Sequence, residues 1–213
     1  MERLNFIYKR KSVRKFLDQP VLRSDLEEIL KAATFAPSGK NIQNWHFVVV
    51  EGRDMIGKVA QVIEDKVRLL AGKTENEEIS KAMIGGIPYY TGNLQTAPVV
   101  ILAYASGYPS FGPELLAEGV IDSKEASKLS RFAPGIQNVA AAFENLLLAA
   151  AALGYGTCWM TGPMYASDEI SECIGFQKEG FHLVTMTPLG VPATDGVTPP
   201  RKPLSEVVTF ISK

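Results

Sequence analysis

The residues best suited to chemistry in this chain lie near its start, in the run from Arg10 to Phe16. The run places four cations and one hydroxyl side by side, in the order Arg10-Lys11-Ser12-Val13-Arg14-Lys15-Phe16. Charged donors beside a small hydroxyl suit the oxygens of a phosphate, and arginine pairs with phosphate through two parallel N–H groups. A solvated basic turn and a nuclear-localisation or nucleic-acid patch are the alternatives that the run alone leaves open.

The composition of the whole chain argues against a protein that coats nucleic acid. The 213 residues include 22 Lys and Arg against 23 Asp and Glu, so the formal net charge is -1. Nucleic-acid-binding domains are usually basic along a whole face. A hydrophobic content of 46% and a charged content of 21% indicate a packed globular protein rather than a disordered chain. We therefore expect no nucleic-acid partner.

Other features of the sequence exclude further classes of protein. The two cysteines, Cys158 and Cys173, stand without a CxxC or Cys/His cluster, so we expect no metal site. The first residues lack the apolar core of a signal peptide. The longest apolar run, Val139 to Leu153, is interrupted by polar residues and is shorter than the ~20 residues of a membrane span. We expect a soluble, cytoplasmic protein with no membrane partner.

Hydrophobic spacing and breaker residues predict helices that alternate with strands. Helices are predicted over four segments: 24–35, 54–70, 134–153 and 167–174. Buried strands are predicted over 45–50, 97–104, 155–160 and 181–186. Ser24 and Glu27 form a predicted capping box, Asp54 is the predicted cap of the second helix, and Gly72 is its predicted end. Because no break in composition separates these elements, the pattern favours one α/β-type domain.

Two segments are predicted to be irregular. The stretch from Gly85 to Tyr90 is typical of a flexible loop. Its tyrosines, Tyr89 and Tyr90, suit either surface packing or the covering of a flat ligand. The proline-rich stretch from 191 to 203 must be extended, and it ends in a further cation pair.

The chain offers few reactive side chains of its own. His46, His182 and Cys158 fall in predicted strands, where a buried structural role is ordinary. No G-x-S-x-G, HExxH, GxGxxG or Walker A motif is present. We therefore expect no catalytic side chain and a cofactor that carries the reaction. Flavin mononucleotide (FMN) fits three features of the sequence. Its phosphate suits the basic run, its polar edge suits residues 38–41, and its flat ring suits the strand end at Thr161-Gly162.

Four segments resemble signatures of the FMN-dependent nitroreductase family and occur in the family's order. Residues 10–16 resemble its opening, R-x-S-x-[RK]-x-F, and residues 36–45 resemble A-P-S-x-x-N-x-Q-P-W. Residues 153–159 resemble L-G-[LY]-G-T-C-W, and residues 188–190 with 201–204 resemble the closing G-x-P…R-K-P-L segment. Asn44 replaces the proline of the second signature, so a looser turn is expected there.

The resemblance implies a fold and a set of site residues. The fold is α+β, a nitroreductase-like central mixed β-sheet flanked by helices, in a single domain over 1–213. An intertwined homodimer with a C-terminal extension would hold two identical FMN sites at its interface. The residues implied to bind the cofactor are Arg10, Lys11, Ser12, Arg14, Pro37, Ser38, Gly39, Asn41, Met160, Thr161, Gly162 and Arg201.

The resemblance also implies a role for each group of residues. Arg10, Lys11, Ser12 and Arg201 would hold the phosphate and ribityl chain. Arg14 would lie near the N1/O2 edge of the ring, where a positive charge stabilises the reduced flavin. The 37–41 segment would reach the flavin from the other subunit. Residues 160–162 would pass over the ring face, with a backbone N–H near N5 and a glycine that leaves the ring uncovered.

The implied function is an NAD(P)H-dependent FMN oxidoreductase that works by a ping-pong mechanism. NADH or NADPH would reduce the flavin at N5, and a nitroaromatic, quinone or other flat aromatic acceptor would then take the hydride. One alternative is a specialised member of the fold, either a flavin-fragmenting benzimidazole synthase or a reductive dehalogenase. The other is a non-enzymatic flavin-binding module. The sequence leaves the choice of donor and acceptor open.

Overall fold

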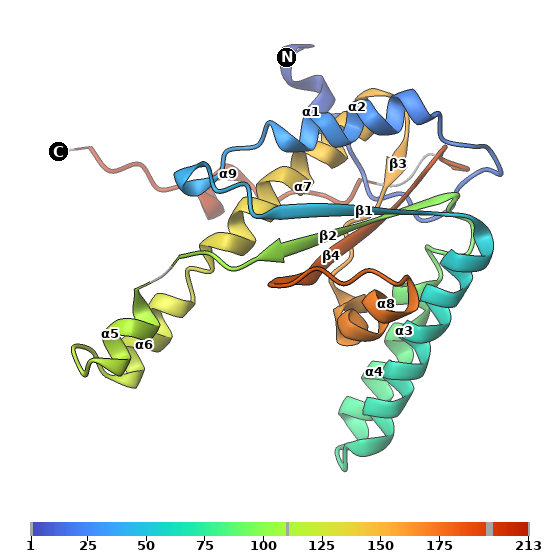
Figure 1. Ribbon diagram of the computed structural model, residues 1–213. Helices are drawn as coiled ribbons and strands as arrows, with labels where there is room; N and C mark the ends of the chain where they lie inside the picture. The colour runs from blue at the N-terminus through green and yellow to red at the C-terminus, as the bar shows by residue number, and fades with distance from the viewer. Residues whose placement is uncertain (1, 110, 195–197, 213) are drawn as a thin grey trace.

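The computed structural model describes residues 2–109, 111–194 and 198–212 and shows an α+β fold (Figure 1). Its centre is a four-stranded sheet in the order β1-β2-β4-β3. The strands are β1 (Trp45–Glu51), β2 (Val99–Ser106), β3 (Gly156–Thr157) and β4 (Phe181–Gly190). All ladders of the sheet are antiparallel, and the parallel pairing in the described ranges is an isolated bridge between Ser12 and Thr157. The expected mixed sheet is therefore antiparallel apart from this bridge.

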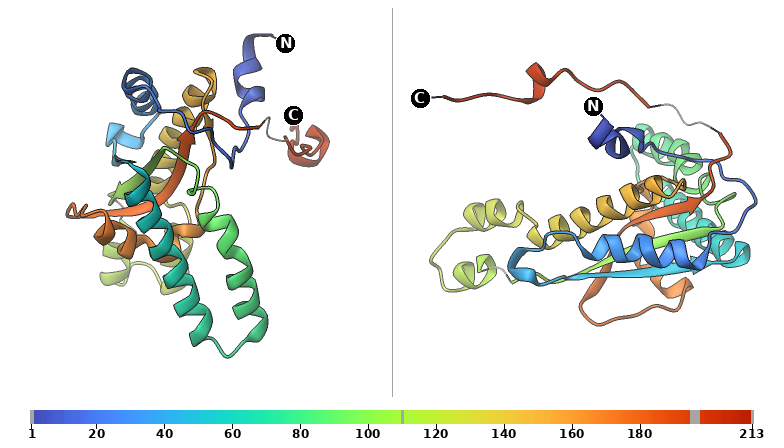
Figure 2. Two further views of the ribbon diagram at one scale, coloured as in Figure 1. Left: turned by 90° about the vertical axis from the view of Figure 1, so that its right-hand side faces the viewer. Right: turned by 90° about the horizontal axis from the view of Figure 1, so that it is seen from above.

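Two pairs of helices cover the two faces of the sheet (Figures 1 and 2). The pairs are α2 (Arg23–Thr34) with α7 (Pro134–Ala152), and α3 (Arg53–Lys73) with α8 (Ser167–Cys173). Successive side chains of a strand point to opposite faces. Ile101 and Ala103 of β2 accordingly join the core beneath α2 and α7, while Leu102 and Tyr104 join the core beneath α3 and α8. Because both faces are covered, β2 is a continuous apolar run, as the sequence predicted.

Further elements extend from this layered core. They are η1 (Glu2–Leu4), α1 (Asn5–Lys9), α4 (Glu77–Thr91), the hairpin of α5 (Gly112–Ala117) with α6 (Ser123–Ser130), and α9 (Leu204–Val207). Figure 1 shows the α5–α6 hairpin at the lower left, away from the sheet, and the C-terminal tail running out past α9. The tail exposes Phe210 at 92% and Ile211 at 87%. Exposed apolar surface of this kind is typical of a contact with another chain.

The expected helix starts and ends differ in detail from the structure. The capping box is wrong, because Ser24 lies inside α2 and Glu27 accepts a bond from Arg23 Nε at 2.9 Å. The cap of α3 is Gly52 rather than Asp54, and the helix continues through Gly72 to Lys73. A glycine inside a helix costs only about 1 kcal/mol, which packing of the buried face of α3 outweighs.

The expected loop from Gly85 to Tyr90 is also wrong, because the whole segment lies inside α4. Asn76 begins the helix with its side chain, which accepts bonds from Glu78 N and Ile79 N. Ile87 is buried on the face of α4 that packs against its neighbours. Tertiary packing thus overrides the glycine pair and Pro88 within the segment.

The expected strand 155–160 is shorter in the structure than its apolar sequence predicted. Only Gly156–Thr157 forms a ladder, and Met160 adds an isolated bridge to Met186. Cys158 N donates to the side-chain hydroxyl of Thr187 at 3.0 Å instead of to a backbone carbonyl. The ladder therefore breaks where the chain turns toward Gly162. Residues 195–197 of the expected extended stretch lie outside the described residues.

Candidate functional site

The basic run is anchored beside β3 by its two apolar residues. Val13 and Phe16 are only 4% and 5% exposed, and Val13 N donates to Thr157 O at 2.8 Å. A Cβ on Gly156 would stand 2.6 Å from Val13 Cβ, so the close approach of the two chains requires glycine there. Alternation along an extended chain then turns Ser12 away from the buried side chain of Val13.

Ser12, Arg10 and Arg14 act on the buried thiol of Cys158, the first through a hydrogen bond and the two arginines through their charge. Burial raises the pKa of Cys158, and the two arginines and a hydrogen bond from Ser12 act in the opposite direction. Arg10 Nε lies 3.8 Å from Glu144 Oε1 on α7. This distance exceeds that of a hydrogen bond, so Glu144 does not occupy the N–H donors of the Arg10 guanidinium. Lys11 lies between these residues and is partly buried.

The turn that follows β3 holds the second group of predicted residues. Met160 is buried and exchanges backbone bonds with Met186, at 2.9 and 3.1 Å. Thr161 is exposed, and η3 (Gly162–Ala166) begins at the next residue. The first N–H groups of a helix have no carbonyl partner within it, so Gly162 N–H is such a donor. The segment from Thr157 to Gly162 thus joins the basic run to this turn.

Tyr90 lies directly against the turn at Gly162. A Cβ on Gly162 would come within 2.3 Å of Tyr90 Cε1, so the ring occupies the space that a larger residue would need. Tyr89, the other member of the pair, is 72% exposed. The two tyrosines therefore have different environments: Tyr90 packs on a predicted cofactor residue, and Tyr89 is exposed to solvent.

The turn between α2 and β1 contains η2 (Gly39–Asn41) and holds three non-glycine residues at positive φ: Lys40 at 55°, Asn41 at 51° and Gln43 at 48°. Each such residue costs about 1–3 kcal/mol and persists only where its surroundings hold it in place. Asn41 N donates to Ser38 O, and Gln43 N donates to Ser38 Oγ, each at 2.8 Å. Gln43 Nε2 donates to Asn41 Oδ1 at 3.1 Å. Two predicted cofactor residues therefore also hold the turn together.

Two buried asparagines tie this turn to α7 and to the end of β2. Gly39 N donates to Asn138 Oδ1 at 3.0 Å, and Asn138 Nδ2 donates to Asn44 Oδ1 at 2.9 Å. Asn44 Nδ2 donates to Ser106 O at 2.9 Å and to Gly135 O at 3.2 Å. The expectation that Asn44 loosens the turn is therefore wrong, because its buried side chain secures the turn from within.

Sequence reasoning missed Asn138 and Tyr108 as neighbours of this turn. A Cβ on Gly39 would stand 2.6 Å from the hydroxyl of Tyr108, so the tyrosine packs on the turn. The signal for Asn138 was a polar carboxamide in the apolar helix that begins at Pro134, but Gln137 and Asn145 of the same helix gave the same signal. Tyr108 had no such signal, because it lies in a Pro/Gly-punctuated stretch.

Within one chain the predicted residues form two clusters and leave Arg201 apart. Along α7 the contact of Gly39 with Asn138 and that of Arg10 with Glu144 are six residues apart, or about 9 Å of helix axis. Figure 1 shows the turn between α2 and β1 on the left, whereas β3 lies to the right of centre. Arg201 is exposed in the tail, where its Nη1 donates to Pro199 O at 3.4 Å. Pro37 is exposed at the start of the first turn.

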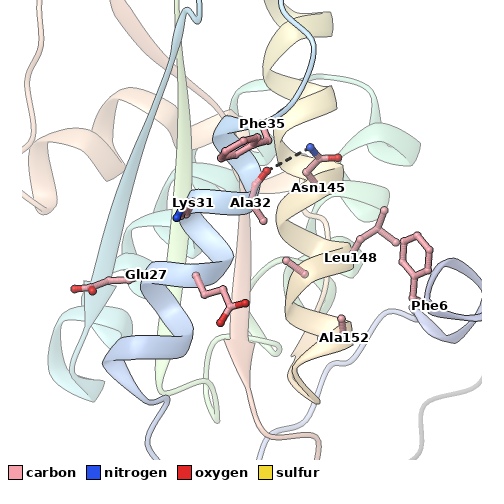
Figure 3. A pocket seen from close by; sticks show the side chains of 10 residues that line it. Phe6, Glu27, Lys31, Ala32, Phe35, Asn145, Leu148 and Ala152 are labelled. Carbon is pink, nitrogen blue, oxygen red and sulfur yellow. Dashed lines mark hydrogen bonds between the residues drawn. The ribbon is translucent and has the colours of Figure 1, made fainter.

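A shallow groove of about 800 Å³ lies between α2 and α7 (Figure 3). Phe35 and Leu148 project into it, and Phe6 of α1 closes one side. Asn145 Nδ2 donates to Ala32 O at 3.3 Å across its floor. The groove is lined mainly by apolar atoms, with Glu27, Glu28, Lys31 and Asn145 also in its lining. An open, mainly apolar groove suits a docking surface better than a cofactor site.

The other titratable residues that the sequence singled out do not join the clusters. His46 stacks on Phe176 with ring centroids 5.1 Å apart, and Lys178 Nζ lies 3.3 Å from its Nδ1. Burial lowers the pKa of His46, and the charge of Lys178 lowers it further. In the part of the chain that the structure describes, no three His, Cys, Asp or Glu side chains are placed to hold a metal ion. No described helix has the length and hydropathy needed to cross a membrane.

Comparison with known proteins identifies the family of this chain. A crystal structure of a BluB-like flavoprotein from Clostridium difficile 630 is 41% identical over 100% of both chains, with a TM-score of 0.88. A protein of Archaeoglobus fulgidus, provisionally named NADH dehydrogenase/NAD(P)H nitroreductase, is 29% identical over 90% of this chain and 86% of its own. Iodotyrosine deiodinase of Nematostella vectensis is 25% identical over 95% of this chain and 72% of its own. The model of the Nitroreductase family matches residues 7–191, and the protein therefore belongs to that family.

Proposed function

We propose that this protein is an FMN-dependent oxidoreductase that transfers hydride from NADH or NADPH, through the flavin, to a flat aromatic acceptor. The observation that carries the proposal is that a short segment of chain joins two groups of hydrogen-bond donors, the basic run and the turn at Gly162. Ser12 hydrogen-bonds the thiol of Cys158, the charges of Arg10 and Arg14 act on that thiol, and the chain runs from Cys158 to Gly162 within four residues. One end offers cations for a phosphate, and the other offers a backbone N–H beside a glycine.

The donor chemistry of the two ends fits FMN. Arg10 retains its guanidinium fork beside Ser12, which suits phosphate oxygens. Gly162 N–H begins η3 and has no carbonyl partner within it, so it is a donor for a bound ligand. When bound, FMN would supply the hydride transfer, while Arg14 would stabilise negative charge on the reduced ring. No side chain of the protein is required as a general acid.

A homodimer completes the proposed site. The 37–41 turn and Arg201 lie apart from the basic run within one chain. In a pair of chains that exchange their tails, both could approach the cofactor of the partner. The groove between α2 and α7, and the exposed Phe210 and Ile211, supply the apolar surface that such a pair would bury. We propose that residues 1–213 form one cofactor-binding domain and that the protein is cytoplasmic.

The direct test is the visible absorbance of the purified protein under argon. A flavin band that bleaches when NADH or NADPH is added, and returns with a quinone or nitroaromatic, supports the proposal. A protein that neither binds added FMN nor oxidises NAD(P)H would overturn it. Bound FMN without turnover on any acceptor would instead identify a non-enzymatic flavin-binding module.

A specialised reaction of the same fold is the second candidate. It is favoured by the 41% identical structure, which is described as BluB-like, and by the similarity to a deiodinase. Oxygen-dependent loss of reduced FMN with formation of dimethylbenzimidazole would identify a flavin-fragmenting enzyme. Release of halide from a halogenated phenol by the reduced protein would identify a reductive dehalogenase.

A further inference from the structure

The buried pair Asn44 and Asn138 forms a hydrogen-bond chain with a fixed direction. The chain starts at the carbonyls of Ser106 and Gly135, passes through Asn44 Nδ2 and Oδ1 to Asn138 Nδ2, and ends with Asn138 Oδ1 on Gly39 N. If either carboxamide were turned over, like groups would face each other. Turning over Asn44 would lose its bonds to Ser106 O, Gly135 O and Asn138, and turning over Asn138 would lose its bonds to Asn44 and Gly39. Both side chains are buried, so water does not replace such a loss.

The turn that this chain holds leaves hydrogen-bond donors for a ligand. Ser38 Oγ accepts from Gln43 N, and Asn41 Oδ1 accepts from Gln43 Nε2. The acceptor atoms of both side chains are thus engaged within the turn. The hydroxyl hydrogen of Ser38 and the carboxamide hydrogens of Asn41 are the donors that remain. A turn of this kind suits a ligand edge that is rich in acceptors.

Asparagine at position 44 also allows Gln43, the residue before it, to adopt a positive φ. Gln43 has φ at 48°, and a proline at 44 would push Gln43 toward extended backbone. The Asn44 side chain also links the turn to Ser106 and Gly135, which flank the stretch that contains α5 and α6. Tyr108 strengthens this link, since it packs against both Gly39 and Gly135.

We propose that Asn44 and Asn138 are positioning residues that hold the 38–43 turn in its left-handed form, so that Ser38 and Asn41 present donors to acceptor atoms of FMN. This inference rests on the proposed function and goes beyond it, because neither asparagine touches the cofactor. The two residues act as one unit, since each orients the carboxamide of the other.

The test combines hydrogen exchange with FMN titration in Asn44→Ala, Asn138→Ala and the double variant. Hydrogen exchange needs no cofactor, and we expect the amides of Gly39–Gln43 to exchange at least tenfold faster in each variant. We expect the Kd for FMN to rise at least tenfold in each single variant and no further in the double variant. Asn76→Ala is the control, because it removes the cap of α4, which lies on the opposite side of the sheet from the turn in Figure 1, and it should change neither quantity.

Each other outcome counts against the inference. Unchanged exchange at Gly39–Gln43 would show that the pair does not hold the turn. Faster exchange with an unchanged Kd would leave the pair a purely structural role. Effects on the Kd that multiply in the double variant would show that the residues act independently. A wild-type protein that binds no FMN overturns the proposed function itself, which is distinct from wild-type binding that the variants leave intact.

Discussion

Tyr90 and Gly162 are packed so closely that a Cβ on Gly162 would stand 2.3 Å from Cε1 and 2.5 Å from Cδ1 of the tyrosine ring. Gly162→Ala must therefore displace the ring of Tyr90 or the turn itself. We expect a loss of about 1–3 kcal/mol in the free energy of unfolding, as overpacking commonly gives. Urea unfolding of the single variants and of the Tyr90→Ala/Gly162→Ala double variant measures the effect. If Tyr90→Ala does not relieve the loss, the ring is not the obstacle.

The two arginines of the basic run are expected to differ in their effect on the flavin. Arg10→Ala should weaken FMN binding by about 1.5–3 kcal/mol, because Arg10 supplies charged hydrogen bonds to phosphate in the proposed site. Arg14→Ala should lower the reduction potential of bound FMN more than it weakens binding, because it removes positive charge near the ring. FMN titration and spectroelectrochemistry measure the two quantities.

Arg68→Ala is the matched control for these variants. Arg68 pairs with Glu64 on the exposed surface of α3 and should alter neither affinity nor potential. The proposed division of roles is wrong if both Arg10→Ala and Arg14→Ala simply release FMN.

The start of α2 depends on a tyrosine distant in sequence. Tyr155 Oη donates to Asp25 Oδ2 at 2.7 Å and accepts from Leu22 N at 3.3 Å. Tyr155→Phe removes both bonds, so we expect a loss of about 1–2 kcal/mol in the free energy of unfolding. Thermal or urea unfolding measures it, and Tyr89→Phe, at an exposed position, should have no effect. Equal stability of Tyr155→Phe and wild type would contradict this role.

The two cysteines should differ in reactivity in the folded protein. Burial raises the pKa of Cys158, so its thiolate forms only at a higher pH than in an exposed cysteine, and the thiolate is the reactive form. Cys173 is partly exposed and should react first with iodoacetamide. Arg14→Ala should raise the pKa of Cys158 further, because Arg14 favours the thiolate. Mass spectrometry of the alkylated peptides across a pH series measures both rates.

A reversed order of labelling would show that Cys158 is accessible. Equal pH profiles for wild type and Arg14→Ala would show that the charge of Arg14 does not act on the thiol. Labelling in urea supplies the reference, because both cysteines should then react alike.

Local sequence patterns predicted most of the main elements. The apolar spacing after Pro134 predicted α7 and its end before Gly154, and the run 97–104 predicted β2. Such patterns succeed because the periods of helix and strand are properties of neighbouring residues. The resemblance of four segments likewise predicted the family. Each of these segments can be recognised from neighbouring residues alone, without knowledge of where it lies in the fold.

The tertiary structure alone decided how these parts are fixed in space. The expected cap at Ser24 gave way to a bond from Leu22 N to Tyr155, a residue 133 positions away in the chain. Asn44 was expected to loosen a turn and instead pairs with Asn138, 94 positions away. The sequence does not predict such pairings, because the partner of a side chain depends on how the helices pack on the sheet. The basic run itself was therefore visible in the sequence. Its neighbours at Cys158 and Glu144 and its separation from the 37–41 turn came only with the fold.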